Sequence, residues 1–403
     1  MTSHNSVKRT QVIVAGAGPA GVVAAYRLAQ RGIDVLLLEA QPFCPEDMRA
    51  STFHPPTLDM MEELGLLDTL EAVGLRAPIY QYRNRGTGAV LQLDMGEVAD
   101  VLKHPYRLQC EQFKLTRLVT GLLKDHPHGE VKFSRRVVHF EQDETGVTVQ
   151  VEAPNELETY QADYIIAADG ANSLIRKYLG TEFEGFTYAE KFLTLSTDTP
   201  LEQHFDNLAD VNYVADAKEW CVLLKVPTLW RVLVPAREDE PDAALLSDEK
   251  KTAVFNGLVP DGAAVKTYHR TLYRVHQRVA KKYRHGRVIL VGDSAHLNNP
   301  LGGFGMNSGV HDVWNLTDRL TEIFKEGADA DARLDLFERQ RRTVMQEFVQ
   351  AQTIRNKKMM EAVGDAPAMQ TELEAVIADP VRRRDHLLRQ AMVFSRQREA
   401  EIV

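Results

Sequence analysis

Three glycines near the N-terminus have the spacing of a phosphate-binding turn. The segment VIVAGAGPAG places Gly16, Gly18 and Gly21 in a G-x-G-x-x-G pattern after an apolar run, and Glu39 closes the next apolar run. In such a turn the first glycine permits the tight bend, the second leaves room for a pyrophosphate, and the third lets helix and strand pack closely. The backbone N–H groups at the helix start face the phosphate charge, and an acid at position 39 binds ribose hydroxyls. This motif predicts a dinucleotide site and leaves FAD and NAD as alternatives.

Two later segments carry further polar and glycine-rich motifs. The first, DYIIAADGANSLIRKYLG, contains Asp169 and Gly170, and the second, GRVILVGDSAHLNNPLGGFGMNSG, contains Asp293. Together with GAGPAG they resemble the para-hydroxybenzoate hydroxylase family, the single-component class of FAD-dependent aromatic monooxygenases. The resemblance runs from Val12 to about Leu320 and rests on three motifs in a fixed order.

The resemblance implies positions for the flavin. Asp293 would hydrogen-bond the ribityl chain of FAD, and Asp169 and Gly170 would lie where the flavin and nicotinamide sites meet. The buried carboxylate of Asp293 would otherwise be costly, because it needs a hydroxylated or charged partner. The expected FAD contacts are Gly16, Gly18, Ala20, Gly21, Glu39, Arg49, Gln109, Asp169, Gly170, Asp293, Pro300, Gly303, Gly305, Met306 and Asn307.

The glycine run at 302–305 suits a flat ring system. Without side chains, its backbone can come against the isoalloxazine ring. A helix that starts near Met306 would point its positive end at the pyrimidine edge of the ring, which becomes anionic when the flavin is reduced.

Apolar periodicity supplies the elements that would position these residues. A strand at 11–15, a helix at 20–30 and a strand at 34–39 form a βαβ unit with strands buried on both faces. Further strands are expected at 131–140, 147–151, 164–168, 220–226, 230–235 and 286–291. Further helices are expected at 55–70 with a break at Gly65, and at 111–124, 248–257, 305–324 and 331–396, the last broken at Pro367 and Pro380.

The expected fold class is α/β, with a Rossmann-like FAD-binding domain, an inserted β-sheet substrate domain and C-terminal helices. The chain of 403 residues is long enough for two closely associated domains. The expected boundaries are 1–76, 104–180 and 276–330 for the FAD-binding domain, 77–103 and 181–275 for the substrate domain, and 331–403 for the helical region.

Composition excludes several classes of protein. The net charge of −9 disfavours a nucleic-acid partner, because phosphate-binding surfaces carry excess Lys and Arg. No apolar run approaches the roughly 18 residues of a membrane span, and the polar N-terminus lacks a secretory signal. Cys44, Cys110 and Cys221 form neither a redox pair nor a zinc pattern, so we expect no metal and a reducing cytoplasm.

The resemblance implies a monooxygenase that consumes NADH or NADPH and dioxygen. It would hydroxylate a phenolic or heteroaromatic small molecule through a flavin hydroperoxide, in a pocket that excludes water. The sequence contains no second G-x-G-x-x-G segment and no redox cysteine pair. It also lacks the W-x-W-x-I-P string that flavin halogenases usually carry. The alternatives are a flavin-dependent reductase of a double bond and a non-enzymatic flavin-binding regulator. Homodimers are common among the shorter members, so a homodimer is one expected assembly.

The sequence does not identify a catalytic residue. A group that favours the phenolate form of the substrate is needed, and the candidates are His54, Tyr80, Tyr82, Tyr213, His204 and His296. His296 follows Asp293 and is expected to hold that loop. Arginines that could pair with an acidic substrate are Arg83, Arg85, Arg231 and Arg237.

Overall fold

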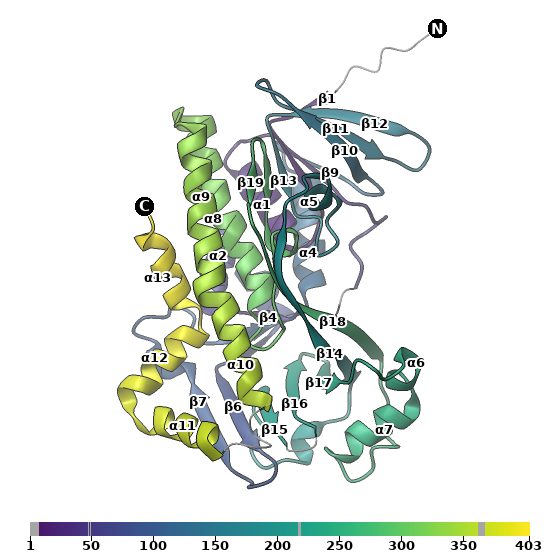
Figure 1. Cartoon of the computed structure of the whole chain (residues 1–403), viewed down its shortest axis with the longest axis vertical. Helices are drawn as coiled ribbons and strands as arrows, with labels where there is room; N and C mark the ends of the chain where they lie inside the picture. The colour runs from purple at the N-terminus through teal and green to yellow at the C-terminus, as the bar shows by residue number, and fades with distance from the viewer. Residues whose placement is uncertain (1–7, 47, 49, 217–218, 362–366) are drawn as a thin grey trace.

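The computed structural model describes residues 8–46, 48, 50–216, 219–361 and 367–403. A mostly parallel sheet lies at one end of the molecule, and a large, mostly antiparallel sheet lies at the other (Figure 1). Long helices from the C-terminal part of the chain run along one side of both.

The parallel sheet has six strands in the order β19-β20-β13-β2-β3-β9. Its members are β2 (Val12–Ala15), β3 (Val35–Leu38), β9 (Gly129–Lys132), β13 (Tyr164–Ala167), β19 (Arg284–His285) and β20 (Val288–Leu290). Every residue of β2, β3, β13 and β20 is buried. Continuous burial is typical of parallel strands with helices on both faces.

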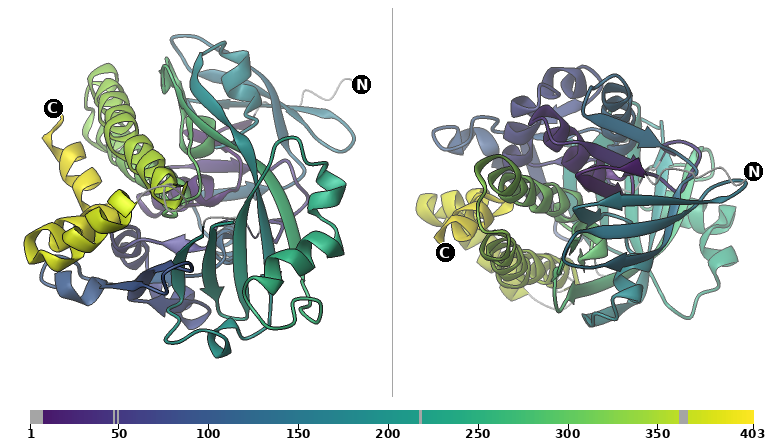
Figure 2. Two further views of the ribbon diagram at one scale, coloured as in Figure 1. Left: turned by 60° about the horizontal axis from the view of Figure 1, so that its bottom comes forward. Right: turned by 90° about the horizontal axis from the view of Figure 1, so that it is seen from above.

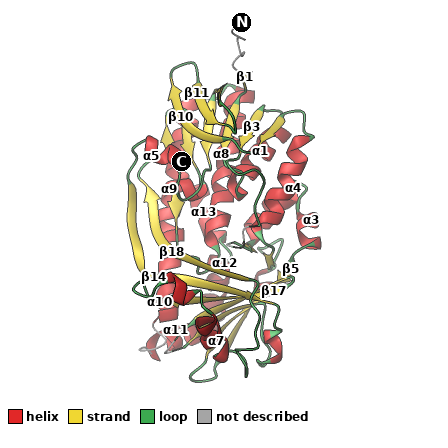
Figure 3. Ribbon diagram, turned by 90° about the vertical axis from the view of Figure 1, so that its right-hand side faces the viewer, coloured by secondary structure: helices red, strands yellow, loops and turns green. Residues whose placement is uncertain are grey.

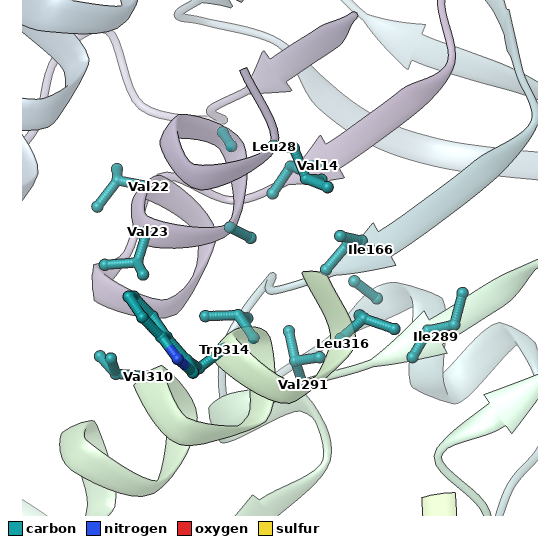
Figure 4. Close-up of a cluster of buried hydrophobic side chains, with 14 of the residues drawn as sticks. Val14, Val22, Val23, Leu28, Ile166, Ile289, Val291, Val310, Trp314 and Leu316 are labelled. Carbon is teal, nitrogen blue, oxygen red and sulfur yellow. The ribbon is translucent and has the colours of Figure 1, made fainter. Parts of the chain in front are cut away.

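Helices α1 (Pro19–Gln30), α4 (Gln112–Lys124) and α8 (Phe304–Glu326) cover this sheet. Apolar side chains from α1, α8 and the strands meet in one core, in which Val23, Val310 and Trp314 are neighbours (Figure 4). Arg27 of α1 lies over the Trp314 ring at 3.5 Å and donates to the Trp314 carbonyl at 2.6 Å. The helix that follows the first motif is thereby tied to the helix that follows the last.

The second sheet has eight strands in the order β21-β18-β14-β17-β16-β15-β6-β7 (Figure 3). They are β6 (Ile79–Asn84), β7 (Val90–Asp94), β14 (Phe183–Thr197), β15 (Val211–Ala215), β16 (Cys221–Val226), β17 (Leu229–Ala236), β18 (His269–Ala280) and β21 (His296–Leu297). The segments expected at 77–103 and 181–275 therefore meet in one sheet. β18 extends past the boundary expected at 275.

Two smaller sheets complete the β structure. One contains β4 (Thr52–Phe53), β5 (Leu75–Ala77) and β8 (Arg107–Gln109); the other contains β1 (Lys8–Arg9), β10 (Arg136–Gln142), β11 (Val147–Glu152) and β12 (Leu157–Ala162). The single strand expected at 131–140 is wrong, because β9 and β10 belong to different sheets. Ser134, with φ of 52°, turns the chain between them.

Helices fill the remaining segments. The expected helix at 55–70 is α2 (Pro55–Glu63) and α3 (Leu67–Ala72), separated at Gly65, where φ is +71°. The others before residue 330 are α5 (Leu174–Tyr178), α6 (Asp242–Leu245) and α7 (Asp248–Asn256), with the short 3-10 turns η1 (Met95–Val98), η2 (Leu201–Gln203) and η3 (Gly292–Ser294).

The C-terminal region is helical, as expected (Figure 2). It comprises α9 (Ala330–Val344), the π-helical η4 (Met345–Gln350), α10 (Ala351–Glu361), α11 (Pro367–Ala378), α12 (Pro380–Gln390) and α13 (Val393–Glu401). Pro380 begins α12, where its missing N–H has no intrahelical role. None of the described helices has the length and apolar character of a membrane span.

Candidate active site

A cavity of about 1140 Å³ lies between the parallel sheet and the eight-stranded sheet. Its walls come from all three motifs, which are far apart in the sequence. The expected contact residues that line it are Gly16, Gly18, Ala20, Glu39, Asp169, Gly170, Asp293, Pro300, Gly303, Gly305 and Met306. The structure thus brings the three motifs together around one space.

The glycine turn has the geometry that its spacing predicts. Gly16 has a φ of +104°, and a Cβ there would lie 2.3 Å from the carbonyl oxygen of Ala168. A Cβ on Gly21 would lie 1.9 Å from the carbonyl oxygen of Gly16, so Gly21 is required for packing and does not line the cavity. If Gly18 carried a Cβ, no atom of the described residues would lie within 4 Å of it. The space in front of α1 is therefore open for a phosphate group.

Glu39 is held at the carboxyl end of β3. Its Oε2 accepts a hydrogen bond from the Ala17 N–H at 2.7 Å, and its Oε1 accepts one from the Gln41 N–H at 2.8 Å. Each carboxylate oxygen has more than one acceptor position, so both can still receive ribose hydroxyls.

Asp169 has an unsatisfied oxygen beside the cavity. Its Oδ2 accepts the Ile175 N–H at 3.2 Å, whereas its buried Oδ1 has no hydrogen-bond partner among the described residues. Burial raises the pKa of Asp169, and hydrogen bonds from Ser173 and Ile175 oppose the increase. Such an oxygen fits a ligand that brings hydroxyl or N–H donors.

The segment 297–303, here called the glycine loop, passes into α8. Gly302 and Gly303 have φ values of +105° and +72°, and α8 begins at Phe304, two residues before the expected start. A Cβ on Gly302 would lie 2.4 Å from the ring of Phe304. The helix N-terminus thus points toward the cavity, where it favours negative charge.

Two expected contacts lie behind the cavity wall. Asn307 donates from Nδ2 to the carbonyls of Thr52 at 2.8 Å and Gly303 at 2.7 Å, and its Oδ1 accepts the His54 N–H at 2.9 Å. Its side chain therefore supports the glycine loop. Gln109 is fully buried and accepts the Thr52 hydroxyl at 3.0 Å, but its Nε2 has no hydrogen-bond partner among the described residues. Arg49 lies outside the described residues.

The loop that carries Asp293 is fixed from behind by a buried charge network. Asp312 Oδ2 accepts the Gly292 N–H at 3.0 Å and lies 2.6 Å from His296 Nε2. Its Oδ1 accepts Arg341 Nε at 2.8 Å, and Arg341 also pairs with Glu399 of α13. Burial opposes ionisation of Asp312, yet His296 and Arg341 lower its pKa. The expectation that His296 holds this loop agrees with these contacts.

The site fits FAD, because it combines an open phosphate position, a ribose-binding acid, an unsatisfied Asp169 oxygen and a glycine loop. The family described as FAD binding domain matches residues 9–352. Para-nitrophenol 4-monooxygenase of Pseudomonas sp. (strain WBC-3) is 31% identical over 84% of each chain. The 6-hydroxy-3-succinoylpyridine 3-monooxygenase HspB of Pseudomonas putida (strain DSM 28022 / S16) is 32% identical over 85% of this chain and 86% of its own.

A solved structure has the same fold over nearly the whole chain. The p-nitrophenol 4-monooxygenase PnpA of Pseudomonas putida DLL-E4 superposes with a TM-score of 0.88 at 29% identity, covering 96% of this chain and 99% of that chain. The chain belongs to the family of FAD-dependent aromatic monooxygenases. The predictions of fold class, FAD cofactor, NAD(P)H co-substrate and monooxygenase activity are confirmed. In this monooxygenase, bound FAD reduced by NAD(P)H activates dioxygen for transfer of one oxygen atom to an aromatic ring.

The other half of the cavity is lined mainly by the eight-stranded sheet, together with Arg107 from β8 and Leu301 from the glycine loop. Its lining includes apolar side chains, hydroxyl groups, one imidazole and three guanidinium groups. The lining residues are Arg107, Thr194, Tyr213, Val222, Leu224, Arg231, Leu233, Tyr273, Arg274, Val275, His276 and Leu301. A mostly apolar wall with few polar groups is typical of a small-molecule pocket.

Arg107 is the most unusual residue of this half. It is 1% exposed, its guanidinium lies 4.4 Å from the centre of the Tyr80 ring, and Nη1 contacts the Tyr213 hydroxyl at 3.5 Å. Its Nε and Nη2 have no hydrogen-bond partner among the described residues. A buried cation with unpaired donors is costly, so this geometry favours an anionic ligand beside it.

The candidates for substrate activation are spread over the molecule. Tyr213 and Arg231 line the cavity, and Arg231 Nη1 donates to Ser51 Oγ at 2.9 Å. Tyr80 lies beneath Arg107, and Tyr82 stacks on Tyr213 at 5.1 Å, outside the cavity.

His54 is buried behind the glycine loop, where its Nε2 lies 2.7 Å from the carbonyl oxygen of Gly302. Burial and the charge of Arg107 lower the pKa of His54 to about 3, so the ring is neutral at physiological pH.

The remaining candidates lie outside the cavity wall. His204 is exposed, and the contacts of Arg83, Arg85 and Arg237 are with Gln81, Asp216 and Asp239 respectively. Sequence reasoning missed Arg107, Thr194 and Tyr273. One signal in the sequence could have indicated Arg107. It stands two residues before Gln109, and on a strand two such side chains point to the same face.

Proposed function

We propose that this monooxygenase hydroxylates a small phenol or hydroxypyridine that carries a substituent para to the hydroxyl group, at the substituted carbon. The observation that carries this proposal is the charge of the cavity. Arg231 of β17 and Arg107 of β8 both line the substrate half of the cavity. Among the described residues, three acidic side chains line the cavity, and all of them lie in the nucleotide half. They are Glu39, Asp169 and Asp293.

A cationic, mostly apolar pocket favours the phenolate form of a phenol. Arginine charge lowers the pKa of a nearby acidic hydroxyl, because it stabilises the anion. The phenolate ring is richer in electrons than the phenol ring and is therefore a better acceptor of an electrophilic oxygen atom. Apolar residues such as Val222, Leu233 and Leu301 exclude water from the reacting carbon.

The position of oxygenation follows from the names of the relatives. Para-nitrophenol 4-monooxygenase acts at the carbon that carries the nitro group. The 3-monooxygenase of 6-hydroxy-3-succinoylpyridine acts at the carbon that carries the succinoyl group. Pentachlorophenol 4-monooxygenase of Sphingobium chlorophenolicum, 27% identical over 84% of this chain, acts at a chlorinated carbon. In all three cases that carbon lies para to the hydroxyl group, and we propose the same position here.

The proposed reaction balances with one reduced nicotinamide. For 4-nitrophenol, dioxygen, NAD(P)H and one proton give 1,4-benzoquinone, nitrous acid, water and NAD(P)⁺. The new C–O bond forms at the para carbon and the C–N bond breaks, with nitrite as the leaving group. Arg107 and Arg231 would hold the phenolate oxygen during this exchange.

The test is turnover of the FAD-loaded enzyme with 4-nitrophenol, 4-chlorophenol and 5-hydroxypyridine-2-carboxylate, under air and without oxygen. We expect oxygen uptake that depends on the phenol, and release of nitrite or chloride in proportion to product. Turnover without oxygen would support the reductase alternative. Hydroxylation with retention of the para substituent would overturn the proposed position.

Replacing Arg107 tests the anion site directly. We expect Arg107→Met to weaken binding of 4-nitrophenolate by about 10- to 100-fold, as loss of a charged hydrogen bond does. The absorbance of the bound phenolate, titrated with pH in the absence of NAD(P)H, should show a higher pKa of the ligand than in wild type. Arg107→Lys should restore part of the affinity, because it keeps the charge but not the planar donors.

Arg237→Met is the matched control, because Arg237 is exposed and pairs with Asp239. Equal phenolate affinity and ligand pKa in the Arg107→Met variant and the control would exclude Arg107 from substrate binding.

We also propose a reducing cytoplasm and a homodimer as the setting of this enzyme. Cys44, Cys110 and Cys221 are all free and buried, which supports a compartment without disulfide formation. The homodimer rests on the family resemblance, and light scattering of the FAD-loaded protein after size-exclusion chromatography tests it.

A further inference from the structure

Side chains of the C-terminal helices reach the backbone of the glycine loop. Gln350, the last residue of the π-helical η4, donates from Nε2 to the Leu297 carbonyl at 3.0 Å. Asn356 of α10 donates from Nδ2 to the Leu301 carbonyl at 3.1 Å. Between them, the Thr353 carbonyl accepts Asn299 Nδ2 at 3.0 Å. Three points on one helical segment thus bind three points on the loop.

The π-helical turn explains how one helix face supplies these contacts. A π-helix places an extra residue in a turn, so it shifts the face that the following residues present. Such turns occur frequently at functional sites.

These contacts belong to a buried network of amides. Gln277 of β18 donates to the Thr353 hydroxyl at 2.9 Å and accepts the Asn299 N–H at 3.1 Å. Asn356 Oδ1 accepts Gln352 Nε2 at 2.8 Å and Gln390 Nε2, from α12, at 3.2 Å. Asn299 and Thr353 are 0% exposed and Asn356 is 4% exposed. A buried polar network of this kind has one satisfied arrangement, so it fixes geometry more strictly than apolar packing does.

The loop is held from its other side as well. His54 contacts the Gly302 carbonyl and Asn307 donates to the Gly303 carbonyl, both at 2.7 Å. The loop therefore lies between the amide side chains of Gln350 and Asn356 on one side and the start of α8 on the other. Its residues Pro300, Leu301, Gly302 and Gly303 line the cavity at the junction of the nucleotide and substrate halves.

We propose that Asn356, with Gln390 behind it, is a positioning residue that sets the placement of the glycine loop against the flavin ring. Displacement of the loop would admit water beside the reduced flavin and change the position of the ring relative to the substrate. NAD(P)H, a proton and dioxygen would then give NAD(P)⁺ and hydrogen peroxide, with no product formed. This inference rests on the proposed contact between the glycine loop and FAD.

The principal test compares the variants Asn356→Leu and Gln390→Leu. Asn356→Leu removes the donor to Leu301 at nearly constant volume, whereas Gln390→Leu removes only the outer partner. We expect Asn356→Leu to retain bound FAD but to lower the ratio of hydroxylated product to NAD(P)H oxidised about tenfold, the effect expected from one lost buried hydrogen bond. Hydrogen peroxide should rise in proportion, and Gln390→Leu should have a smaller effect of the same kind.

Gln340→Leu is the matched control. Gln340 is a buried amide of α9 that bonds Asn315 and the Ile402 carbonyl, remote from the glycine loop. It should lower thermal stability without changing the product ratio. Equal uncoupling in Gln340→Leu and Asn356→Leu, or unchanged coupling in Asn356→Leu, would overturn the proposal.

A spectroscopic measurement keeps this test independent of the proposed substrate. The visible absorption and circular dichroism of bound FAD report the surroundings of its ring without any turnover. We expect both spectra to change in Asn356→Leu and to match wild type in Gln340→Leu. Should no phenol be hydroxylated by wild type, the proposed substrate class fails, while these spectra still decide the role of Asn356. If Asn356→Leu does not fold, Gln390→Leu and Thr353→Val give the same comparison.

Discussion

Gly18 and Gly21 stand three residues apart in one turn, yet their surroundings differ completely. A Cβ on Gly18 would lie within 4 Å of no described atom, whereas one on Gly21 would overlap the backbone of Gly16. We therefore propose that Gly18 is needed for the ligand, whereas Gly21 is needed for the fold. Arg107 also has room for a ligand, since its Nε and Nη2 have no hydrogen-bond acceptor among the described residues.

Alanine substitutions separate the two roles. Gly18→Ala should fold normally, because its backbone has a φ of −68°, but should bind FAD at least about tenfold more weakly. Gly21→Ala should lower the free energy of unfolding by several kcal/mol even without FAD, as overpacking against backbone does. Chemical denaturation of the apoprotein and fluorescence titration with FAD measure the two effects. Normal FAD affinity in Gly18→Ala would show that no phosphate group lies at this turn.

At the scale of elements, helices α8, α9 and α13 of the C-terminal part of the chain support the turn that presents Asp293. Asp312 of α8, Arg341 of α9 and Glu399 of α13 form a continuous buried ion network. Asp312 also accepts the Gly292 N–H, so the network reaches the turn that presents Asp293. The C-terminal helix thus contributes to the site although it is far from the motifs in the sequence.

Removal of Arg341 should be strongly destabilising. Arg341→Met removes the cation that Asp312 and Glu399 share and leaves Glu399 paired with Arg396 alone, and loss of a buried partner of this kind costs about 3–5 kcal/mol. Guanidinium denaturation of the FAD-loaded protein should show this difference, together with weaker FAD retention. Arg339→Met, at an exposed position of the same helix, is the control and should change stability by less than about 0.5 kcal/mol. A small effect of Arg341→Met would mean that water solvates the carboxylates of Asp312 and Glu399 in the variant.

The whole molecule should lose stability in mild acid because burial lowers the pKa of several histidines, among them His54 and His311. The pKa of His54 is about 3 in the folded state, against 6.5 for an exposed histidine. The unfolded chain therefore binds a proton between these values and the folded chain does not. The contribution of His54 is fully present above pH 6.5 and declines as the pH falls toward 3.

Measured between pH 6.5 and 4, the free energy of unfolding should fall by about 1.4 kcal/mol per pH unit on account of this group. His54→Gln should flatten that slope, because its Nε2 can still donate to the Gly302 carbonyl but does not titrate in this range. Identical slopes for wild type and His54→Gln would show that the pKa of His54 is not lowered in the native enzyme.

Much of the nucleotide half could be predicted from the sequence, and little of the substrate half. The glycine turn, Glu39, Asp169 and Asp293 line one cavity, and each follows from local spacing beside a uniformly apolar strand. Their contacts with FAD stay a prediction. The strand predicted at 131–140 was wrong, because its apolar pattern continues across the turn at Ser134.

Thr194 of β14 and Tyr273 of β18 reach the pocket through pairing between distant strands, and Arg107 reaches it from β8, which pairs with β4 and β5. β14 pairs with both β17 and β18, and β15 pairs with β6 across more than a hundred residues, so their register decides which side chains share a face. A shift of one residue would reverse every side chain. Local residue preferences carry no information on such a register; it follows from burial of the complete sheet against the rest of the molecule.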